Sequence, residues 1–504
     1  MKILPTSQIK ELDAYTIEHE PIRSIDLMER AATALTEAIA GRYTDRNTPF
    51  IIFAGPGNNG GDALAVARLL SERGYAPEVY LFNPKEALSP DCEKNRNRLY
   101  VCSTVRLHEV SNQFTPPHLT AETVVIDGLF GSGLKRPLEG GFASVVKYLN
   151  ASAATVVAID IPSGLMGEDN GINNPAHIVR ASWTLSLQLP KLAFLMADCE
   201  AYIGEWQLLD IGLSTEAIRE AETDYTLLDK ESVKALLKPR RRFSHKGNYG
   251  RALLIAGSQG MAGASVLSAR ACLRSGVGLL TVHLPFCNNF IVQTAVPEAM
   301  TQIDYNDVCF SEAIDTEEYT AVAIGPGLGQ TPETEQALLE QIETTRCPMV
   351  IDADALNLLG RHREYLQRLP QDTILTPHPK ELERLTGRAE NSYERLQQAR
   401  RLAMEADVCV VLKGAYSAIC TPDGRVVFNP TGNPGMATGG TGDVLTGILL
   451  ALLAQGYKAD EAARLGVYLH GLAGDVAALR LGEVSLLASD VIEALPEGIL
   501  SLSR

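Results

Sequence analysis

A glycine-rich stretch near the C-terminus ends in a single carboxylate. Residues 433–443 read NPGMATGGTGD, and an apolar run from Val444 to Leu453 follows. Glycines let backbone N–H groups approach a ligand without a Cβ in the way, and the N-terminus of a helix favours anions. Asp443 stands where an anion would bind, so the pattern indicates a base beside an anion-binding loop. The alternative is an aspartate that only caps the next helix.

Three polar loops in the first half also carry groups that could do chemistry. They read GPGNNGGD, DGLFGSG and DIPSG, at residues 55–62, 127–133 and 160–164. Asn59, Asp127 and Ser163 offer oxygen ligands without His or Cys, which suits a hard cation such as K⁺, Mg²⁺ or Ca²⁺. Asp160 and Lys135 form a candidate acid/base pair at the same edge. For each residue alone, a turn or capping role is the simpler alternative.

The elements that must position these loops are short apolar runs, at residues 50–54, 123–126 and 155–159. Continuous apolar strands of this kind are typical of a parallel sheet that is covered on both faces. Ligands of such sheets bind at the carboxyl ends of the strands, which is where all three loops lie. Ahead of them, an apolar stripe from Leu27 to Ile39 at helical spacing predicts a packing helix.

The second half repeats this pattern after a polar stretch from Ser214 to Lys230. Apolar runs again precede polar loops, at residues 252–256, 321–324, 349–351, 374–375 and 408–412, and a hairpin turn is predicted at residues 422–424. A chain of 504 residues is too long for one ordinary core. We therefore predict an α/β protein with two doubly wound domains, residues 1–220 and 228–500, and a boundary between residues 213 and 228.

The composition limits the classes of partner. The net charge of −16 disfavours generic binding to nucleic acid or to an anionic membrane, so any phosphate must be bound locally. Nine cysteines are scattered without a CxxC pair, which favours reduced thiols over a disulfide framework. The N-terminus, residues 1–6, has no apolar core of signal-peptide length, and no run in the sequence approaches the span of a bilayer. We expect a cytoplasmic protein that binds neither nucleic acid nor membrane.

The three loops of the first half resemble the signature loops of the NAD(P)H-hydrate epimerase family, over about residues 1–220. That family has a Rossmann-like fold and interconverts the R and S epimers of hydrated NAD(P)H. The resemblance implies a K⁺ bound by Asn59, Asp127 and Ser163, with Asp160 and Lys135 as acid and base. It also implies that the hydrate is held by Asn58, Asn59, Gly60, Gly61, Asp62, Gly131, Ser132, Gly133, Leu134, Lys135, Arg136, Pro137 and Asp160.

The second half resembles the ADP- or ATP-dependent NAD(P)H-hydrate dehydratase family of the ribokinase-like superfamily, over about residues 228–500. The motifs are SHKG, AGS, GPGLG, DADA, TPHPKE and LKGA, at residues 244–247, 256–258, 325–329, 352–355, 376–381 and 412–415. The resemblance implies that Asp443 is the base. It implies nucleotide contacts by Lys413, Gly414, Ala415, Tyr416, Ser417, Gly440, Thr441 and Gly442, and hydrate contacts by Gly263, Ala264, Gly327, His378 and Asp443.

The two resemblances together cover the chain, so the whole chain resembles the bifunctional NAD(P)H-hydrate repair enzymes. They imply that ADP, or ATP, phosphorylates the ring hydroxyl of the S hydrate, with Mg²⁺ neutralising phosphate charge. Elimination of phosphate then restores the dihydropyridine, while the first domain supplies the S epimer. The expected ligands are hydrated NADH and NADPH with ADP or ATP, and a homo-oligomer is expected.

Two other functions fit parts of the chain. The Asp443 loop alone is compatible with a ribokinase-like kinase for a small alcohol, and the epimerase-like first half argues against it. A non-catalytic nucleotide-binding or interaction protein is the other alternative, and intact candidate acids at Asp160 and Asp443 argue against that.

Overall fold

Two units, each built on its own sheet, make up the chain. The computed structural model describes residues 1–102 and 104–503. One unit comprises Lys2–Thr223, and the other comprises Asp224–Arg504 together with Met1. None of the helices in residues 1–102 and 104–503 combines the length and the apolarity that crossing a bilayer requires.

The first unit alternates strands and helices. Its strands are β1 (Lys2–Ile3), β2 (Phe50–Ala54), β3 (Glu78–Phe82), β4 (Arg106–Val110), β5 (Val124–Gly128), β6 (Thr155–Ile159), β7 (Trp183–Leu187) and β8 (Glu205–Leu209). Its α-helices are α1 (Thr6–His19), α2 (Ser24–Arg42), α3 (Asn58–Glu72), α4 (Pro90–Leu99), α5 (Gly140–Asn150), α6 (Glu200–Ile203) and α7 (Thr215–Glu220). Short 3₁₀ turns are η1 (Pro175–His177), η2 (Leu192–Leu195) and η3 (Ala197–Cys199).

The sheet of the first unit is parallel and doubly wound. The strand order is β4-β3-β2-β5-β6-β7-β8, and each neighbouring pair is parallel. Strands β2 and β5 are buried along their whole length, because helices and loops pack on both faces. The order reverses between β2 and β5, the position where ligands of such sheets bind. The predicted fold class is confirmed for this half.

One local expectation was wrong: residues 58–62 are helical rather than part of a loop. Helix α3 begins at Asn58, so the NNGGD segment forms the first five residues of this helix. Gly60 makes this position of the helix possible, because a Cβ there would overlap the carbonyl oxygen of Gly55. The polar side chains of this segment are therefore presented from a helix start, directly after strand β2.

The second unit has ten strands and ten α-helices among its described residues. The strands are β9 (Tyr225–Leu227), β10 (Arg251–Ile255), β11 (Leu279–Leu284), β12 (Met300–Ile303), β13 (Ala321–Ile324), β14 (Met349–Ile351), β15 (Ile374–Leu375), β16 (Cys409–Leu412), β17 (Ala418–Cys420) and β18 (Val426–Phe428). The helices are α8 (Lys230–Lys234), α9 (Ala262–Arg274), α10 (Phe286–Ala295), α11 (Pro332–Thr344), α12 (Ala353–Leu359), α13 (Pro379–Thr386), α14 (Ser392–Ala406), α15 (Thr441–Ala454), α16 (Ala459–Leu481) and α17 (Ala488–Ser503). Its 3₁₀ turns are η4 (Lys246–Tyr249), η5 (Arg363–Arg368) and η6 (Pro434–Met436).

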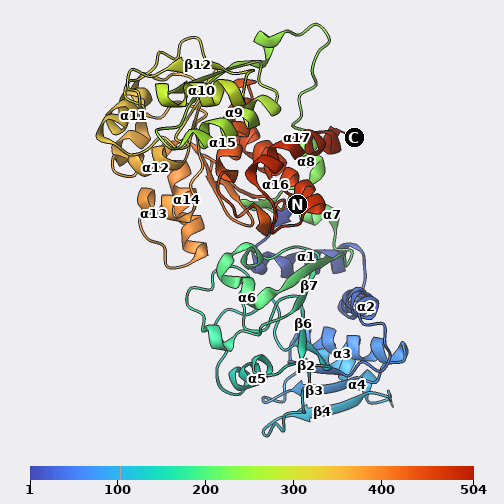
Figure 1. Cartoon of the computed structure of the whole chain (residues 1–504). Coiled ribbons are helices and arrows are strands. Elements are labelled where there is room, and N and C mark those ends of the chain that lie inside the picture. The colour runs from blue at the N-terminus through green and yellow to red at the C-terminus, as the bar shows by residue number, and fades with distance from the viewer. Residues whose placement is uncertain (103, 504) are drawn as a thin grey trace. The chain divides into compact units, whose positions relative to one another are not determined.

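The strands of the second unit follow the order β9-β18-β17-β16-β15-β14-β13-β10-β11-β12. The pairs from β12 across to β16 are parallel, and β16, β17 and β18 pair antiparallel, which confirms the predicted hairpin turn between β17 and β18. Helices α9, α15, α16 and α17 pack together in one layer, while α11 to α14 follow one another in another (Figure 1). The order reverses between β10 and β13, so the loops after these strands face a second candidate site.

Candidate active sites

The first site lies where α3 starts beside the loop that follows β5. The Asn59 side chain lies against Gly131: a Cβ placed on Gly131 would be 3.2 Å from Asn59 Oδ1. Asn59 Nδ2 is buried and has no hydrogen-bond partner among the described residues. A buried side-chain amide without a hydrogen-bond partner, close to the end of a strand, is consistent with a group that binds a ligand.

Asp127 and Ser163 form the oxygen-rich centre of this site. Ser163 Oγ donates to Asp127 Oδ1 at 2.6 Å, and the Ser163 amide donates to Asp127 Oδ2 at 2.8 Å. Burial raises the pKa of the fully buried Asp127 carboxyl to about 6, although these bonds and one from the Leu129 amide at 3.2 Å oppose the shift. All three donors are neutral. A buried carboxylate with neutral partners and an adjacent hydroxyl oxygen fits a monovalent cation such as K⁺.

Asp160 lies at the end of β6 in a conformation that is unusual for a residue with a Cβ. Its φ is +65°, in the left-handed region, and backbone strain of this kind is often found at functional sites. The Ser132 amide donates to Asp160 Oδ2 at 3.3 Å, so the loop after β5 reaches the end of β6. The structure therefore brings Asp160 and Ser132 together, as the sequence predicts.

The basic partner of Asp160 is Lys191, which the sequence analysis missed. The Lys191 ammonium forms an ion pair with Asp160 Oδ1 and donates to Ser186 Oγ at 2.8 Å and to the Leu189 carbonyl at 3.3 Å. The Lys191 side chain is 0% exposed, so this pair is enclosed by protein. A lysine set within the apolar segment Leu189–Leu195 was the only signal that the sequence offered.

Lys135, the predicted partner, lies elsewhere on the loop. Lys135 is exposed, as are Arg136, Gly133 and Asn58, while Leu134 and Pro137 are half-buried. No hydrogen bond or ion pair within residues 1–102 and 104–503 joins Lys135 to Asp160. The expected acid/base pair of Asp160 and Lys135 is therefore not formed in this structure, and Asp160 pairs with the buried Lys191 instead.

Two further carboxyls surround Asp160. Asp62, near the start of α3, is 8% exposed, and burial followed by the charges of Asp160 and Asp13 raises its pKa well above the usual value. Asp13, from α1, has its pKa raised to about 6 by burial and then by Asp160, with Lys191 opposing. Helix α1 was not expected to contribute. The site thus contains carboxyls of different proton affinity, a common arrangement for acid/base work.

The second site contains the Asp443 loop. Gly440 has φ +95° and directly precedes α15, and a Cβ at this position would overlap the Leu267 side chain. Gly439 has open space where a Cβ would be. Thr441 and Gly442 then open the helix, so their backbone N–H groups lie at a free helix N-terminus that can bind an anion.

Asp443 lies in the first turn of α15 with its carboxyl unpaired. Within the described part of the chain, only its backbone carbonyl is engaged, by Ser268 Oγ at 2.9 Å. Burial, followed by the charge of Asp352, raises the pKa of the Asp443 carboxyl to about 7, with Lys413 opposing. A carboxyl with this pKa is suited to general-base catalysis near neutrality.

A buried ion pair lies beneath the start of α15. Lys413 Nζ donates to Asp352 Oδ1 at 2.8 Å, and Thr446 Oγ1 donates to Asp352 Oδ2 at 2.7 Å. A Cβ on Gly442 would lie 3.6 Å from Lys413 Nζ, so the ammonium is directly behind the anion-binding loop. Asp352 thereby connects the end of β16, through Lys413, with helix α15. The sequence analysis quoted Asp352 in a motif without assigning this role.

His378 lies next to this ion pair. Its Nδ1 accepts from the amides of Lys380 and Glu381 at 3.1 and 3.3 Å, so the imidazole caps α13. Burial, followed by the positive charge of Lys413, lowers the pKa of His378, which favours the neutral ring. Lys413 Nζ also lies 3.8 Å from Glu381 Oε2. His378 Nε2 lies 3.3 Å from Glu381 Oε1, and the ring remains partly exposed.

The loops after β10 and β13 meet as predicted. Gly327 has φ +59°, and a Cβ there would lie 3.0 Å from both the Met261 carbonyl oxygen and the Ala264 Cβ. Ser258 Oγ donates to the Gly327 carbonyl at 2.9 Å. A Cβ added to Gly263 would meet no atom within 4 Å, so Gly263 faces open space. Gly327, Gly263 and Ala264 thus line one edge of the site.

The predicted nucleotide loop follows Lys413. The Gly414 amide donates to Ser417 Oγ at 3.3 Å, and Ser417 Oγ donates back to the Gly414 carbonyl at 3.1 Å, which closes a tight turn. Gly414 and Ala415 are exposed, and Tyr416 is half-buried. The Lys413 amide donates to the Pro377 carbonyl at 2.9 Å, so this turn is anchored beside His378.

The chain is similar to known proteins over its whole length. Residues 252–497 match the family model described as NAD(P)H-hydrate dehydratase, and residues 24–193 match the model described as YjeF-related protein N-terminus. A bifunctional NAD(P)H-hydrate repair enzyme of Moorella thermoacetica is 36% identical, over 100% of this chain and 98% of its own length.

Two solved structures are similar as well. A ribokinase-like superfamily protein of Enterococcus faecalis is 30% identical, with a TM-score of 0.50 over 56% of this chain and 98% of that one. An ADP/ATP-dependent NAD(P)H-hydrate dehydratase of Bacillus subtilis, co-crystallised with ATP and Mg²⁺, is 34% identical, with a TM-score of 0.47 over 55% of this chain and 98% of that one.

Proposed function

We propose that this chain, which belongs to the family of bifunctional NAD(P)H-hydrate repair enzymes, converts hydrated NADH and NADPH back to the reduced dinucleotides. We assign epimerisation of the R and S hydrates to residues 1–220 and dehydration of the S hydrate to residues 228–500. The observation that carries the proposal is the unpaired Asp443 carboxyl beside the free N-terminus of α15, above the Lys413–Asp352 pair.

Dehydration begins with transfer of a phosphoryl group from ADP to the ring hydroxyl. Asp443 accepts the hydroxyl proton as the oxygen attacks the terminal phosphorus, and AMP leaves. The amides of Gly440 to Gly442 donate to the transferring phosphoryl oxygens, which is positional and electrostatic catalysis. The phosphate then departs with the C–O electrons, assisted by the ring nitrogen lone pair. Loss of a proton from the neighbouring ring carbon restores the double bond.

The nucleotide is proposed to lie on the turn from Lys413 to Ser417, next to Gly442. The Lys413 ammonium behind Gly442 favours phosphate there, because its pKa is raised by Asp352 and Glu381 against the opposing effect of burial, which keeps it charged. Mg²⁺ bound with the nucleotide would neutralise part of the phosphate charge. The hydrate is proposed to contact Gly327, His378 and the turn at Gly263 and Ala264.

Epimerisation is proposed to use the carboxyls around Asp160. A protonated carboxyl donates to the ring hydroxyl, water leaves as the nitrogen lone pair forms an iminium bond, and water adds to the opposite face while Asp160 accepts its proton. Asp62 and Asp13, whose pKa values are raised by burial, are the groups able to carry the donated proton near neutrality. K⁺, held by Asn59, Asp127 and Ser163, would supply a fixed positive charge for orienting water and hydrate.

The test is the appearance of NADH absorbance from a mixture of R and S NADH hydrates, with ADP and ATP compared. We expect complete conversion with stoichiometric AMP and phosphate when ADP is supplied. Formation of a stable phosphorylated product without NADH would contradict dehydration and point to a kinase. We place this activity in the cytoplasm, where the nine free cysteines would remain reduced.

A further inference from the structure

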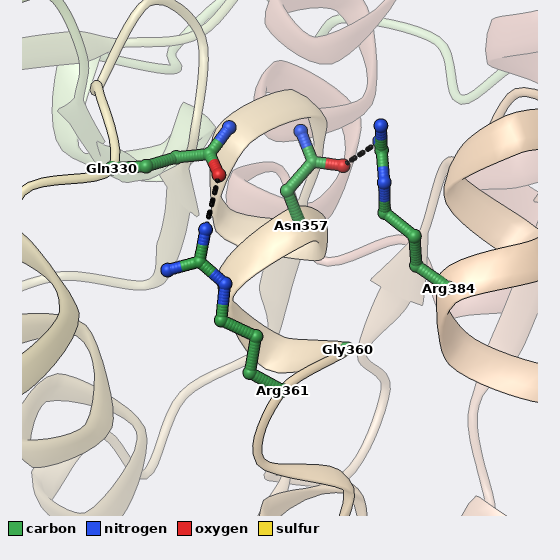
Figure 2. Close-up of a pocket in the computed structure, with 5 residues that line it drawn as sticks. All are labelled: Gln330, Asn357, Gly360, Arg361 and Arg384. Carbon is green, nitrogen blue, oxygen red and sulfur yellow. Dashed lines mark hydrogen bonds between the residues drawn. The ribbon is translucent and has the colours of Figure 1, made fainter.

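We propose that the cavity between α12 and α13 binds a phosphate group of the hydrated dinucleotide. This inference rests on the proposed function and adds a substrate subsite to it. The cavity has a volume of about 420 Å³ and is lined by Gln330, Asn357, Gly360, Arg361 and Arg384 (Figure 2). None of these five residues is acidic, although the chain as a whole carries a net charge of −16.

The two arginines give the cavity its positive charge. Arg384 donates to the amide oxygen of Asn357, so its guanidinium is held by a neutral group. Arg361 Nη2 donates to Gln330 Oε1 at 2.8 Å, while its Nη1 pairs with Glu335 Oε2 at 2.8 Å. Figure 2 shows both guanidinium groups held in place by these amide oxygens. Arg384 has no carboxylate partner among the described residues, and a guanidinium with free N–H groups is suited to phosphate.

The wall that carries Gln330 continues into the dehydration site. Gln330 Nε2 donates to Asp354 Oδ1 at 2.8 Å, and the Gly329 amide donates to Asp354 Oδ2 at 2.9 Å. Gly329 belongs to the same loop as Gly327, which is predicted to contact the hydrate. The negative charge of Asp354 also contributes to raising the pKa of Asp443, so the two groups are close enough to interact.

The opposite wall continues into the site through α13. His378 caps this helix, and Arg384 lies six residues further on, about 9 Å along the axis. The charge of Arg384 contributes to lowering the pKa of His378, after burial and Lys413. Gly360 allows the close approach of α12 and α13, because a Cβ there would lie 3.1 Å from the Arg384 Cβ. The positive charge of Arg384 therefore acts at His378, which is predicted to contact the hydrate.

The hydrate is the ligand that needs such a subsite. Its reacting ring must lie at Asp443, and its pyrophosphate, with the 2′-phosphate of the NADPH form, extends away from that ring. ADP, the phosphoryl donor, is assigned to other elements, namely the turn after β16 and the start of α15. The arginine-lined cavity is left for the phosphates of the hydrate.

The deciding variant is Arg384→Gln, with Arg425→Gln as the matched control. Arg425 pairs with Asp423 in the turn between β17 and β18, so it loses the same charge away from the cavity. We expect Arg384→Gln to raise KM for the S hydrate about tenfold, the effect of losing a charge-assisted hydrogen bond, with kcat and the KM for ADP unchanged. Arg361→Gln should act in the same direction.

Comparison of the two hydrates identifies the phosphate. A larger loss for the NADPH hydrate supports binding of the 2′-phosphate, and an equal loss for both supports binding of the pyrophosphate. An unchanged KM for both hydrates in an active Arg384→Gln enzyme refutes the subsite. A raised KM for ADP alone also refutes it, because the cavity would then serve the nucleotide.

A binding measurement separates this inference from the proposed function. Inorganic pyrophosphate is titrated by calorimetry into the wild type, Arg384→Gln and Arg425→Gln with AMP saturating. Weaker binding in Arg384→Gln alone supports an anion subsite even if no hydrate is turned over. Equal binding by all three proteins refutes it, and a wild type that never regenerates NADH refutes the proposed function instead.

Discussion

The Asp443 carboxyl combines burial, a free helix N-terminus and a neighbouring Lys413–Asp352 pair. Burial and the charge of Asp352 favour its protonated form, while Lys413 limits the shift, which leaves the pKa at about 7. A hydroxyl proton can therefore be accepted at neutral pH without a permanent ion pair that would block the carboxylate. The same side chain would be a poor structural cap, because its oxygens accept no hydrogen bond from the described residues.

Asp443→Asn is expected to lower kcat for dehydration by a factor of about 100 or more, since an amide cannot accept the hydroxyl proton. In the wild type, kcat/KM for dehydration should fall about tenfold for each pH unit below 7, where Asp443 becomes protonated. Epimer exchange, followed on separated hydrates, should be unchanged in the variant. Dehydration by Asp443→Asn at the wild-type rate would show that another group is the base.

The same substitution should stabilise the second unit at alkaline pH. The pKa of Asp443 in the folded chain, about 7, lies above the value of 3.8 for a free side chain, so folding favours the protonated form. This stabilisation is complete below pH 4 and is lost as the pH rises towards 7. We expect Asp443→Asn to raise Tm by a few degrees at pH 8 and to have no effect near pH 4, measured by calorimetry.

Lys191 is expected to be a positioning residue for Asp160. Lys191→Met removes the only cationic partner that the described residues give Asp160, so the carboxylate should lose its orientation. We expect epimer exchange to slow about a hundredfold, with kcat lowered more than KM is raised. Dehydration of pure S hydrate is the internal control. Lys135→Met should slow epimer exchange much less. A larger effect of Lys135→Met than of Lys191→Met would show that Lys135 is the functional partner of Asp160.

At the scale of elements, both sites depend on helices that pack very closely against neighbouring backbone. Glycines make these approaches possible: Gly60 lies against Gly55 below α3, and Gly447 of α15 lies against the backbone of Ser268 in α9. A Cβ at either position would overlap a carbonyl oxygen. The catalytic geometry therefore rests on backbone-to-backbone packing as much as on the polar side chains.

Gly60→Ala is expected to destabilise the first unit by about 2–3 kcal/mol, because α3 must move away from β2. Epimer exchange should fall with it, since Asn59 and Asp62 belong to the same helix. Gly57→Ala is the control: Gly57 has φ −91° and open space around a Cβ, so its effect should stay within about 0.5 kcal/mol. Urea unfolding monitors stability, and similar values for both variants would contradict this account.

At the scale of the whole molecule, each unit has its own sheet, and we propose a different ion for each site. The first site offers the oxygens of Asn59, Asp127 and Ser163 to a cation, whereas the second offers backbone amides and Lys413, which are proposed to bind phosphate. Each unit has its own strand-order reversal, and each predicted set of loops lies at one of them. A substrate epimer made at one site is the reactant of the other.

Removal of each ion should therefore lower one activity and leave the other intact. Replacing K⁺ by tetramethylammonium, which is too large for the Asp127–Ser163 centre, is expected to slow epimer exchange and to leave dehydration of S hydrate intact. Chelation of Mg²⁺ with EDTA should stop dehydration and spare epimer exchange. Each reaction is followed on separated hydrates. Loss of both activities on removal of either ion would contradict this division.

Most of the strands in both sheets, and most of the loops at their carboxyl edges, could be predicted from the pattern of residues. Apolar runs with glycine loops after them leave few alternatives, because parallel strands bring their loops to one edge of the sheet. The Asp127–Ser163 contact and the meeting of Gly327 with Ala264 follow from that rule. The apolar run after Asp443 predicted a helix, which begins at Thr441.

Only the tertiary structure decided which charges meet. Lys191 is 31 residues from Asp160 in the chain, and Arg384 and Asn357 come from different helices. Helix α1 brings Asp13 to the first site from the start of the chain. The periodicity of a segment reports which face is buried, but the partner of a buried charge depends on how separate elements pack, so no local pattern identifies Lys191 or the arginine-lined cavity.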